Sequence, residues 1–426
     1  MIGDNQEAKP VDIMIGTYDI ERLGADRRHK WHSFPAKYPP ELPNECIEKY
    51  TSQNDVVFDP MSGSGTTLIE AQKLNRLSIG SDVDPLSIVN LNGKFCVSDP
   101  RLLDECYNGL IEAVQNMISK GNESIDSIYD RRFSDKTKEF IQYWFPVDST
   151  AQLVAISDQI LNITDPSMRD FFLMVLSATI ITKHGNVCYA ADLAHTRPHK
   201  VVGKKVVLPL DEFARKYRLI IKDHSFLYKL NVANRPVLHY ADARFLNIED
   251  NSIDLVITSP PYANNAIDYL RAHKFALIWM GYSIEQISSL RKNMIGEVST
   301  AIELIKLPEK TKQMINRIRQ SSKPKSNKLE KYYKDMYQIL SKINQVLKPQ
   351  KHAIVVVASS VIDGIDVSTH ECIIDIALSI GLILDNVQLR DIERNKRMMP
   401  VSSIIKTDSQ IESRMHIEYI IDFKKA

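Results

Sequence analysis

Short apolar runs that end at an acidic residue or a tight turn mark the strands of a predicted sheet. The first run, residues 56–60, leads into a glycine-rich turn and a predicted helix at 68–74, and a second strand follows at 77–82. A strand, a turn, a helix and a strand in this order form the opening unit of a parallel α/β sheet. The pattern predicts further strands, the last two antiparallel, at residues 237–242, 253–257, 353–358, 382–389 and 416–423.

Two stretches break this alternation of strands and helices. Long amphipathic segments between residues 98 and 235 predict a mostly helical insertion. Residues 283–330 are polar and basic and predict a loop, and residues 1–24 predict a loose tail. The expected fold is a doubly wound, Rossmann-like α/β sheet with a mostly helical inserted domain. The sheet domain is built from the segments 25–97, 236–282 and 331–426.

The composition narrows the class of protein. The chain has 426 residues and a formal net charge of +1, and 25% of its residues are charged, which is ordinary for a globular protein. Its five cysteines are scattered without a CxxC pair, so neither disulfides nor a bound metal are expected. No apolar run approaches the length of a membrane span, and the polar N-terminus does not resemble a signal peptide. We therefore expect a cytoplasmic protein without membrane or metal partners.

The glycine-rich turn after the first strand predicts a ligand site. Gly63 and Gly65 allow the backbone to turn tightly and to approach a ligand that a Cβ atom would exclude. Asp59, Asp82 and Asp242 each end a predicted strand, and ligands bind at the carboxyl ends of strands in open α/β sheets. Asp82 follows Asp59 by 23 residues, the spacing at which an acid binds ribose hydroxyls in nucleoside-binding sheets.

The same turn indicates which nucleoside it binds. A phosphate-binding turn carries a lysine after its glycines, whereas this turn carries Thr66 and Thr67. A nucleoside without phosphates is therefore favoured over ATP, and S-adenosylmethionine fits. Asp242, at the end of a third strand, could accept a hydrogen bond from the adenine amino group.

Residues 258–262, Thr-Ser-Pro-Pro-Tyr, form the most distinctive stretch of the chain. They follow the apolar strand 253–257, and the two prolines fix the direction of the chain and remove two backbone donors. Backbone carbonyls are left projecting between the polar Ser259 and the aromatic Tyr262. This arrangement suits the binding of a flat ring that carries an amino group.

The turn 258–262 and the stretch 59–67, Asp-Pro-Met-Ser-Gly-Ser-Gly-Thr-Thr, together resemble the amino-group DNA methyltransferases. This family uses S-adenosylmethionine to methylate cytosine N4 or adenine N6. Residues 32–39 and 79–85 are similar to further motifs of the family, and the resemblance covers about half of the chain. One departure lies at 350–352, Gln-Lys-His, where the family often has two glycines. It affects a turn and not the chemistry.

The resemblance assigns roles to individual residues. The Ser259 side chain and the Pro260 carbonyl would accept the two hydrogens of the amino group, and Tyr262 would stack on the base. The expected catalytic residues are Ser259, Pro260, Pro261 and Tyr262. The expected cofactor-binding residues are Phe34, Lys37, Asp59, Pro60, Gly63, Gly65, Thr66, Thr67, Asp82, Asp84, Asp242, Ala243 and Ser259. His32 is expected to line the cofactor pocket or to pack against its edge.

The target base is left open between two amino groups. Methylation of cytosine C5 needs a nucleophilic cysteine, usually after a proline, and the sequence contains no Pro-Cys pair. By resemblance, Ser259 favours cytosine N4, because the adenine enzymes of the family mostly carry Asp or Asn there. A hydroxyl and a carboxylate both accept hydrogen bonds, so adenine N6 stays the alternative. An RNA amino-group methyltransferase and an inactive nucleic-acid-binding subunit are further alternatives.

Two basic stretches indicate where DNA binds. Residues 190–235 contain ten lysines and arginines against four acids, and residues 304–334 contain ten against two. We expect them to contact phosphates of double-stranded DNA. We place target recognition in the helical insertion 98–235, and we expect the basic loop 283–330 to contact the DNA. The candidate DNA-binding residues are Arg197, Lys200, Lys204, Lys205, Arg317, Arg319, Lys323 and Lys325. The sequence leaves open whether Asp268, Arg271 and His273 contact DNA or are simply exposed to solvent. A cognate restriction endonuclease is a possible partner.

Overall fold

A computed structural model of the chain describes most of its residues. The described residues are 26–35, 37–121, 123–195, 198–231, 234–263, 268–292, 294–295, 305–358, 360–391 and 417–426. The predicted tail 1–24 and the candidate DNA-binding residue Arg197 lie outside them. No helix in the described part of the chain is long and apolar enough to cross a membrane.

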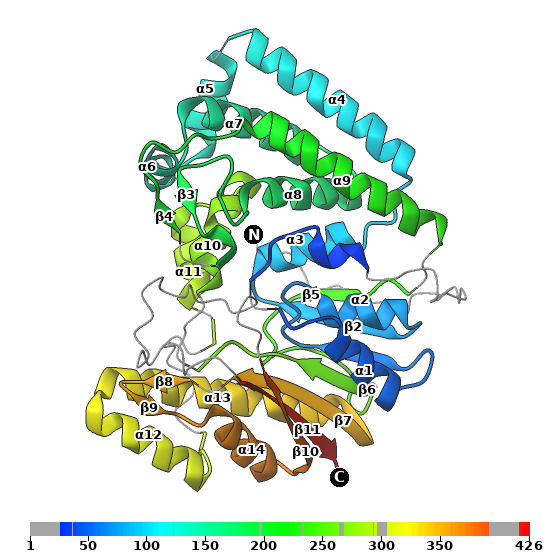
Figure 1. The fold of residues 1–426 in the computed structure, drawn as a ribbon, viewed down its shortest axis with the longest axis vertical. Coiled ribbons are helices and arrows are strands. Elements are labelled where there is room, and N and C mark those ends of the chain that lie inside the picture. The colour runs from blue at the N-terminus through cyan, green and yellow to red at the C-terminus, as the bar shows by residue number, and fades with distance from the viewer. Residues whose placement is uncertain are drawn as a thin grey trace.

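A seven-stranded sheet forms the centre of the lower half of the molecule (Figure 1). Its strands lie in the order β10-β11-β7-β6-β1-β2-β5. Their bounds are β1 Val56–Asp59, β2 Leu77–Asp82, β5 Val237–Tyr240, β6 Ile253–Thr258, β7 Leu347–Ala358, β10 Leu382–Asp391 and β11 Ile417–Lys425. The strands from β7 to β5 are mutually parallel, and β11 is antiparallel to both β7 and β10. The predicted doubly wound sheet with its closing antiparallel strands is confirmed.

Helices cover both faces of this sheet, which explains why every residue of β6 is buried. Alternate residues of each strand point to opposite faces. Val57 and Leu255 therefore pack toward α1 (Glu41–Tyr50) and α2 (Thr66–Lys73). Phe58 and Val256 pack toward α13 (Lys323–Val346) and α14 (Thr369–Ser379) on the other face.

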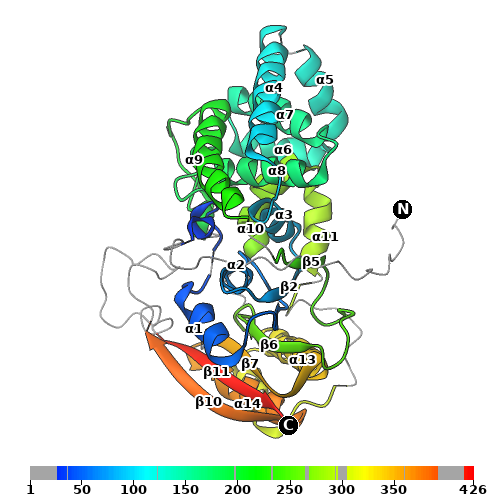
Figure 2. The ribbon, with the colours of Figure 1, turned by 90° about the vertical axis from the view of Figure 1, so that its right-hand side faces the viewer.

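A helical body occupies the upper half of the molecule, above α3 (Pro85–Lys94) (Figures 1 and 2). Its helices are α4 Pro100–Ser119, α5 Glu123–Arg132, α6 Asp135–Trp144, α7 Val147–Leu161, α8 Pro166–Ile180 and α9 Pro209–Lys229. Asp99 and Asp165 accept a backbone hydrogen bond at the start of α4 and of α8, and a proline follows each of them. A short hairpin, β3 Ala190–Ala191 and β4 His199–Lys200, precedes α9. The mostly helical inserted domain of the expected fold is confirmed, and its bounds at 98 and 235 stay a prediction.

The segment predicted as a loop at 283–330 is largely helical, so this prediction was wrong. It contains α11 (Ile284–Lys292), α12 (Glu309–Ser321) and the start of α13. α11 and α10 (Tyr269–Leu277) pack against the core of the helical body, to which Phe275 contributes. α12 packs against the sheet domain. The buried residues Thr311, Ile315 and Ile318 lie on one face of α12. The high charge of the segment led to the prediction of a loop, although these residues have the spacing of a helix.

Candidate active site

The glycine-rich turn joins β1 to α2 at the carboxyl end of the sheet. Gly63 and Gly65 have positive φ angles of +49° and +79°, which residues with a side chain rarely adopt. A Cβ atom on Gly65 would lie 2.1 Å from Cδ2 of Leu91 in α3. The Ser62 amide donates to the Ser81 carbonyl at 2.9 Å, which ties the turn to β2. Glycine at 65 is therefore required by both backbone conformation and packing.

Asp59 is buried beneath this turn and connects three elements. Its carboxylate accepts hydrogen bonds from Thr67 Oγ1 at 2.9 Å, from Thr258 Oγ1 at 2.9 Å and from the Met61 amide at 3.2 Å. Burial raises the pKa of the Asp59 carboxyl to about 6, although the hydroxyl donors act in the opposite direction. Asp59 thereby holds α2 and the end of β6 at fixed positions around the turn.

Asp82, at the end of β2, holds the turn from the other side. Its carboxylate accepts from the Gly63 amide at 2.8 Å, from the Asp84 amide at 2.9 Å and from Ser87 Oγ at 3.1 Å. Burial, and then the charge of Asp84, raises the pKa of the Asp82 carboxyl to about 6. The predicted proximity of Asp82 to the glycine turn is thus present in the structure.

Asp84 has a partner that no sequence pattern indicates. Asp84 caps the start of α3, where one carboxylate oxygen accepts a hydrogen bond from the Leu86 amide at 2.9 Å. Its second oxygen is hydrogen-bonded to Nδ1 of His273. His273 lies on α10 and is fully buried, with its ring centroid 4.9 Å from that of Phe34. It therefore contacts neither solvent nor DNA, and it links the helix after the catalytic turn to the cofactor side of the site.

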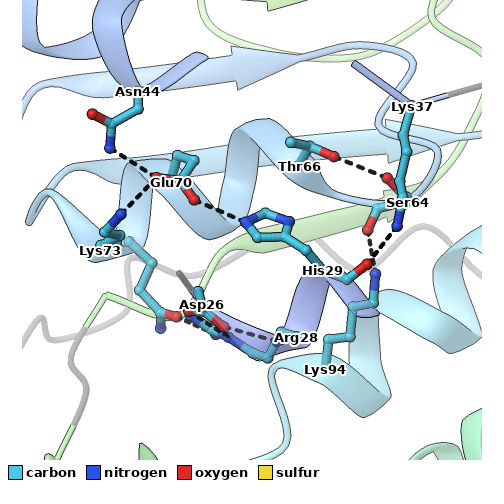
Figure 3. Close-up of polar contacts among 11 residues, drawn as sticks. Asp26, Arg28, His29, Lys37, Asn44, Ser64, Thr66, Glu70, Lys73 and Lys94 are labelled. Atoms are coloured by element: carbon cyan, nitrogen blue, oxygen red, sulfur yellow. Dashed lines mark hydrogen bonds and ion pairs between the residues drawn. The ribbon is translucent and has the colours of Figure 1, made fainter. Parts of the chain in front are cut away.

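Residues 26–35 pack against α2 and against Phe95, which follows α3 (Figure 3). Arg28 is paired with Asp26 at 2.7 Å and donates to Gln72 Oε1 at 2.6 Å, and all three residues are buried. His29 Nε2 lies 2.8 Å from Glu70 Oε1. This network fixes the segment that carries Phe34.

Two lysines support the same region from behind the turn (Figure 3). The buried Lys94 donates to the Ser64 carbonyl at 2.7 Å, and Lys37 donates to the His29 carbonyl. Burial and the nearby charges of Lys37 and Arg28 hold the pKa of the Lys94 amine well below its usual value. His32 is buried as well and bonds Ser177 of the helical body at 2.7 Å. His32 is thus tied to the helical body and is absent from the lining of the cavity described next, so its expected place at the edge of the cofactor pocket stays a prediction.

A cavity of about 370 Å³ opens at the carboxyl end of the sheet. The predicted residues that line it are Phe34, Lys37, Asp59, Gly63, Thr66, Asp82, Asp84, Ser259 and Pro261. Gly65 and Thr67 shape its wall through the contacts described above. Pro260 is buried and Tyr262 is half-buried at the end of the turn that carries Ser259. The structure therefore brings the glycine turn, two strand-end carboxylates and the catalytic serine to one cavity.

Asp242 lies beside this cavity and not in its wall. With Pro60, Ala243 and Asp82 it lines a smaller adjoining space of about 30 Å³. Its carboxylate is paired with Arg244, whose guanidinium also contacts Asp335 at 2.6 Å. An adenine amino group would thus bind a carboxylate that already has an arginine partner. Its predicted role toward adenine stays a prediction.

Among the basic residues before α9, Lys204 differs from its neighbours. Its ammonium lies within hydrogen-bond distance of four carbonyls, those of His184, Gly185, Cys188 and Ala190. These contacts favour a structural role, because an ammonium has only three N–H donors and the carbonyls can occupy all of them. Lys200 lies over the Tyr143 ring at 4.1 Å, and both Lys200 and Lys205 are exposed.

The four candidate DNA-binding residues of α12 and α13 are exposed, and two of them have acidic partners. Arg319 pairs with Glu330 at 2.8 Å, and Lys325 pairs with Asp363 beside the hairpin of β8 (Val361–Ile362) and β9 (Ile365–Asp366). The other two are Arg317 and Lys323. Contact of these residues with DNA stays a prediction.

The strand order, the glycine turn and the strand-end carboxylates define a nucleoside-binding α/β protein of the methyltransferase class. The family described as DNA methylase, with N6 and N4 specificities, matches residues 8–88. The Type II methyltransferase M.MvaI of Kocuria varians is 23% identical over 372 residues, 80% of this chain and 79% of the relative. M.BsoBI of Geobacillus stearothermophilus is 25% identical over 291 residues, 63% of this chain and 55% of the relative.

Among solved structures, a TehB-like S-adenosylmethionine-dependent methyltransferase from Corynebacterium glutamicum is 8% identical. The match covers 90% of this chain and 87% of that one, with a TM-score of 0.29, which is too low to bear on the details of the fold. These matches support an amino-group DNA methyltransferase family for this chain, with S-adenosylmethionine as the methyl donor. The identities do not distinguish N4 from N6 methylation.

The residues around the cavity fit this methyl donor. A volume of about 370 Å³ suits a ligand of nucleoside size. Three carboxylates, those of Asp59, Asp82 and Asp84, line it and suit hydroxyl groups and a net positive ligand. Gly63 lies with its backbone at the wall, where a Cβ atom would be 3.4 Å from the Phe34 ring. Phe34, Asp59, Gly63, Asp82 and Asp84 all line this cavity, and their predicted role in holding the cofactor stays a prediction.

The raised pKa values of Asp59 and Asp82 predict how cofactor binding depends on pH. Both carboxyls have pKa values raised to about 6 in the folded protein, so they lose their charge as the pH falls through this value. A cationic ligand favours the ionised carboxyls, so we expect its Kd to rise as the pH falls below about 6. Calorimetry at about pH 5 and about pH 8 tests this, and equal affinities at both would contradict it.

The free energy of unfolding of the cofactor-free protein is expected to fall as the pH rises, whereas the affinity for the cofactor is expected to increase. The folded protein retains protons on Asp59 and Asp82 that the unfolded chain, with a pKa of 3.8, has already lost. These two carboxyls therefore lower the free energy of unfolding as the pH rises from about 4 to about 6. Replacing Asp82 by asparagine should reduce this part of the pH dependence.

Proposed function

We propose that the protein transfers a methyl group from S-adenosylmethionine to the exocyclic N4 of a flipped-out cytosine in duplex DNA. The observation that supports this most directly is the position of Ser259. It follows the buried strand β6 and lines the same cavity as Asp82 and the glycine turn. The residue proposed to hold the base and those proposed to hold the methyl donor therefore share one space.

The amino group of cytosine is a weak nucleophile, because its nitrogen lone pair is delocalised into the ring. In the proposed mechanism, Ser259 Oγ and the Pro260 carbonyl accept the two amino hydrogens and localise the lone pair. S-adenosylmethionine, when bound, supplies a methyl group on a positively charged sulfur. The two prolines hold the acceptors in place before the base arrives, so the site contributes positioning and electrostatics.

Tyr262 is proposed to offset the cost of taking the base out of the helix. Unstacking a base costs a few kcal/mol, and an aromatic ring that stacks on it contributes about 1–3 kcal/mol. Tyr262 is half-buried and follows Pro260 by two residues in the turn that carries Ser259. We expect the helical body, α4 to α9, to recognise the target sequence, and exposed Arg317 and Lys323 to contact phosphates.

The choice of cytosine N4 rests on the serine in the catalytic turn. Adenine N6 is the alternative, because a serine hydroxyl can accept a hydrogen bond from either amino group. We also propose that the protein is the modification half of a restriction system with a cognate endonuclease. The names of the relatives, Type II methyltransferases, support this role.

Nucleoside mass spectrometry of DNA from cells that express the protein tests the target base. We expect N4-methylcytosine in DNA from cells with the wild-type protein and none with the Ser259→Ala variant. Finding N6-methyladenine instead would overturn the base assignment. DNA that remains unmodified, at normal levels of folded protein, would contradict the proposed substrate.

A further inference from the structure

Three cationic side chains from three different helices line the active-site cavity. Arg271 comes from α10, Arg291 from α11 and Lys328 from α13. α10 and α11 belong to the helical body, whereas α13 packs against the sheet (Figure 1). The cations therefore reach one opening from both parts of the molecule, although the whole chain carries a net charge of only +1.

The two arginines are held by one carboxylate and remain accessible. Asp268, at the start of α10, accepts from the Arg271 amide at 3.2 Å. Its Oδ2 lies 2.6 Å from Nη2 of Arg291 and 3.7 Å from Nε of Arg271. The side chains of Arg271 and Arg291 are 53% and 45% exposed. Asp268 orients both guanidinium groups, but its single negative charge balances only one of their two positive charges. The exposed Lys328 adds a further positive charge at the rim.

The charge of the methyl donor argues that these cations serve another ligand. S-adenosylmethionine carries two positive groups, a sulfonium and an ammonium, and one carboxylate. A cluster of cations therefore repels two of its three charged groups. A nucleotide that enters the cavity brings its phosphodiester groups to the rim. Guanidinium groups bind phosphate oxygens through paired hydrogen bonds. A carboxylate partner such as Asp268 fixes the orientation of the guanidinium group for such a contact.

We propose that Arg271, Arg291 and Lys328 bind a phosphodiester group next to the flipped nucleotide, with Asp268 as the residue that positions the arginines. The proposal rests on the function proposed above and names the part of the substrate that the rim recognises. It assigns Arg271 to DNA contact, which the sequence left open. Because the groups come from both sides of the opening, one phosphate would also hold the helical body against the sheet domain.

The test compares the double variant Arg271→Gln/Arg291→Gln with Arg27→Gln. Arg27 is a matched control, since it is 68% exposed, pairs with Asp223 at 3.1 Å and does not line the cavity. We expect the double variant to bind duplex DNA roughly ten- to a hundredfold more weakly. The slope of log Kd against log salt should fall by about one for each phosphate that the protein no longer neutralises. The Kd for S-adenosylmethionine should be unchanged, and the control should match the wild type in all three.

A second measurement changes the DNA as well as the protein. Duplexes with a single neutral methylphosphonate next to the target base should bind the wild-type protein more weakly, and the double variant should not distinguish them from normal DNA. Unchanged DNA affinity and salt slope in the double variant would overturn the proposal, as would a loss of cofactor affinity alone. If the wild-type protein methylates DNA and the variants bind it normally, only the phosphate site is wrong. If the wild-type protein neither binds nor methylates DNA, the proposed function fails as well.

Discussion

Replacing Ser259 by alanine is expected to lower kcat by roughly 10²- to 10³-fold, the loss typical of one preorganised hydrogen-bonding group in an active site. The alanine leaves one amino hydrogen of the base without an acceptor, so the nitrogen lone pair stays delocalised. Ser259 lines the cavity together with Asp82 and Gly63, but those residues remain in place. The Kd for S-adenosylmethionine should therefore be nearly unchanged.

Single-turnover kinetics and calorimetry measure these two effects separately. Ser252→Ala is the matched control, since Ser252 immediately precedes the other end of β6 and its hydroxyl only bonds the Glu249 carbonyl at 2.6 Å. We expect this variant to transfer methyl groups at the wild-type rate. A collapse of cofactor affinity in Ser259→Ala would show that Ser259 holds the methyl donor and not the base.

Replacing Gly65 by alanine is expected to destabilise the protein and to weaken cofactor binding. The residue has a φ of +79°, which costs a side-chain-bearing residue about 1–2 kcal/mol. The new Cβ atom would lie 2.1 Å from Cδ2 of the buried Leu91, and overpacking of this kind costs about 1–3 kcal/mol more. The sum is a large part of the 5–15 kcal/mol, roughly, by which a typical folded protein is stable.

Gly109→Ala provides a control of the opposite sign. Gly109 lies inside α4, and apart from its chain neighbours and the backbone of its own helix no described atom lies within 4 Å of the position of a Cβ atom. Alanine there should raise the free energy of unfolding by about 0.5–1 kcal/mol, because it reduces the freedom of the unfolded chain. Urea denaturation measures both variants. Equal effects of the two substitutions would contradict the strained, tightly packed turn described here.

The parts of the site that the sequence predicted correctly are those that local patterns determine. Asp59 and Asp82 could be placed because each ends a short apolar run, and parallel strands bring their carboxyl ends to one edge of the sheet. Gly63 and Gly65 could be placed because the turn between strand and helix must be tight. Neither argument needs knowledge of distant contacts.

The parts that the sequence did not predict depend on residues far apart in the chain. His273 and Asp84 are 189 positions apart, and their contact exists only because α10 packs beside the start of α3. Lys204 has the pattern of a DNA-binding lysine until the fold surrounds its ammonium with carbonyls. α12 was hidden for another reason, since the charges of the segment outweighed the helical spacing of its buried residues.

The central claim is that the cavity transfers a methyl group from S-adenosylmethionine to an amino group of DNA. The most direct measurement uses purified protein, S-adenosylmethionine labelled in the methyl group, and equal amounts of duplex DNA and of RNA of the same sequence. We predict that label enters the DNA alone, that the digested product is N4-methylcytosine, and that Ser259→Ala abolishes most of it. Label in the RNA alone, or in neither nucleic acid while the protein binds the methyl donor, would contradict the claim.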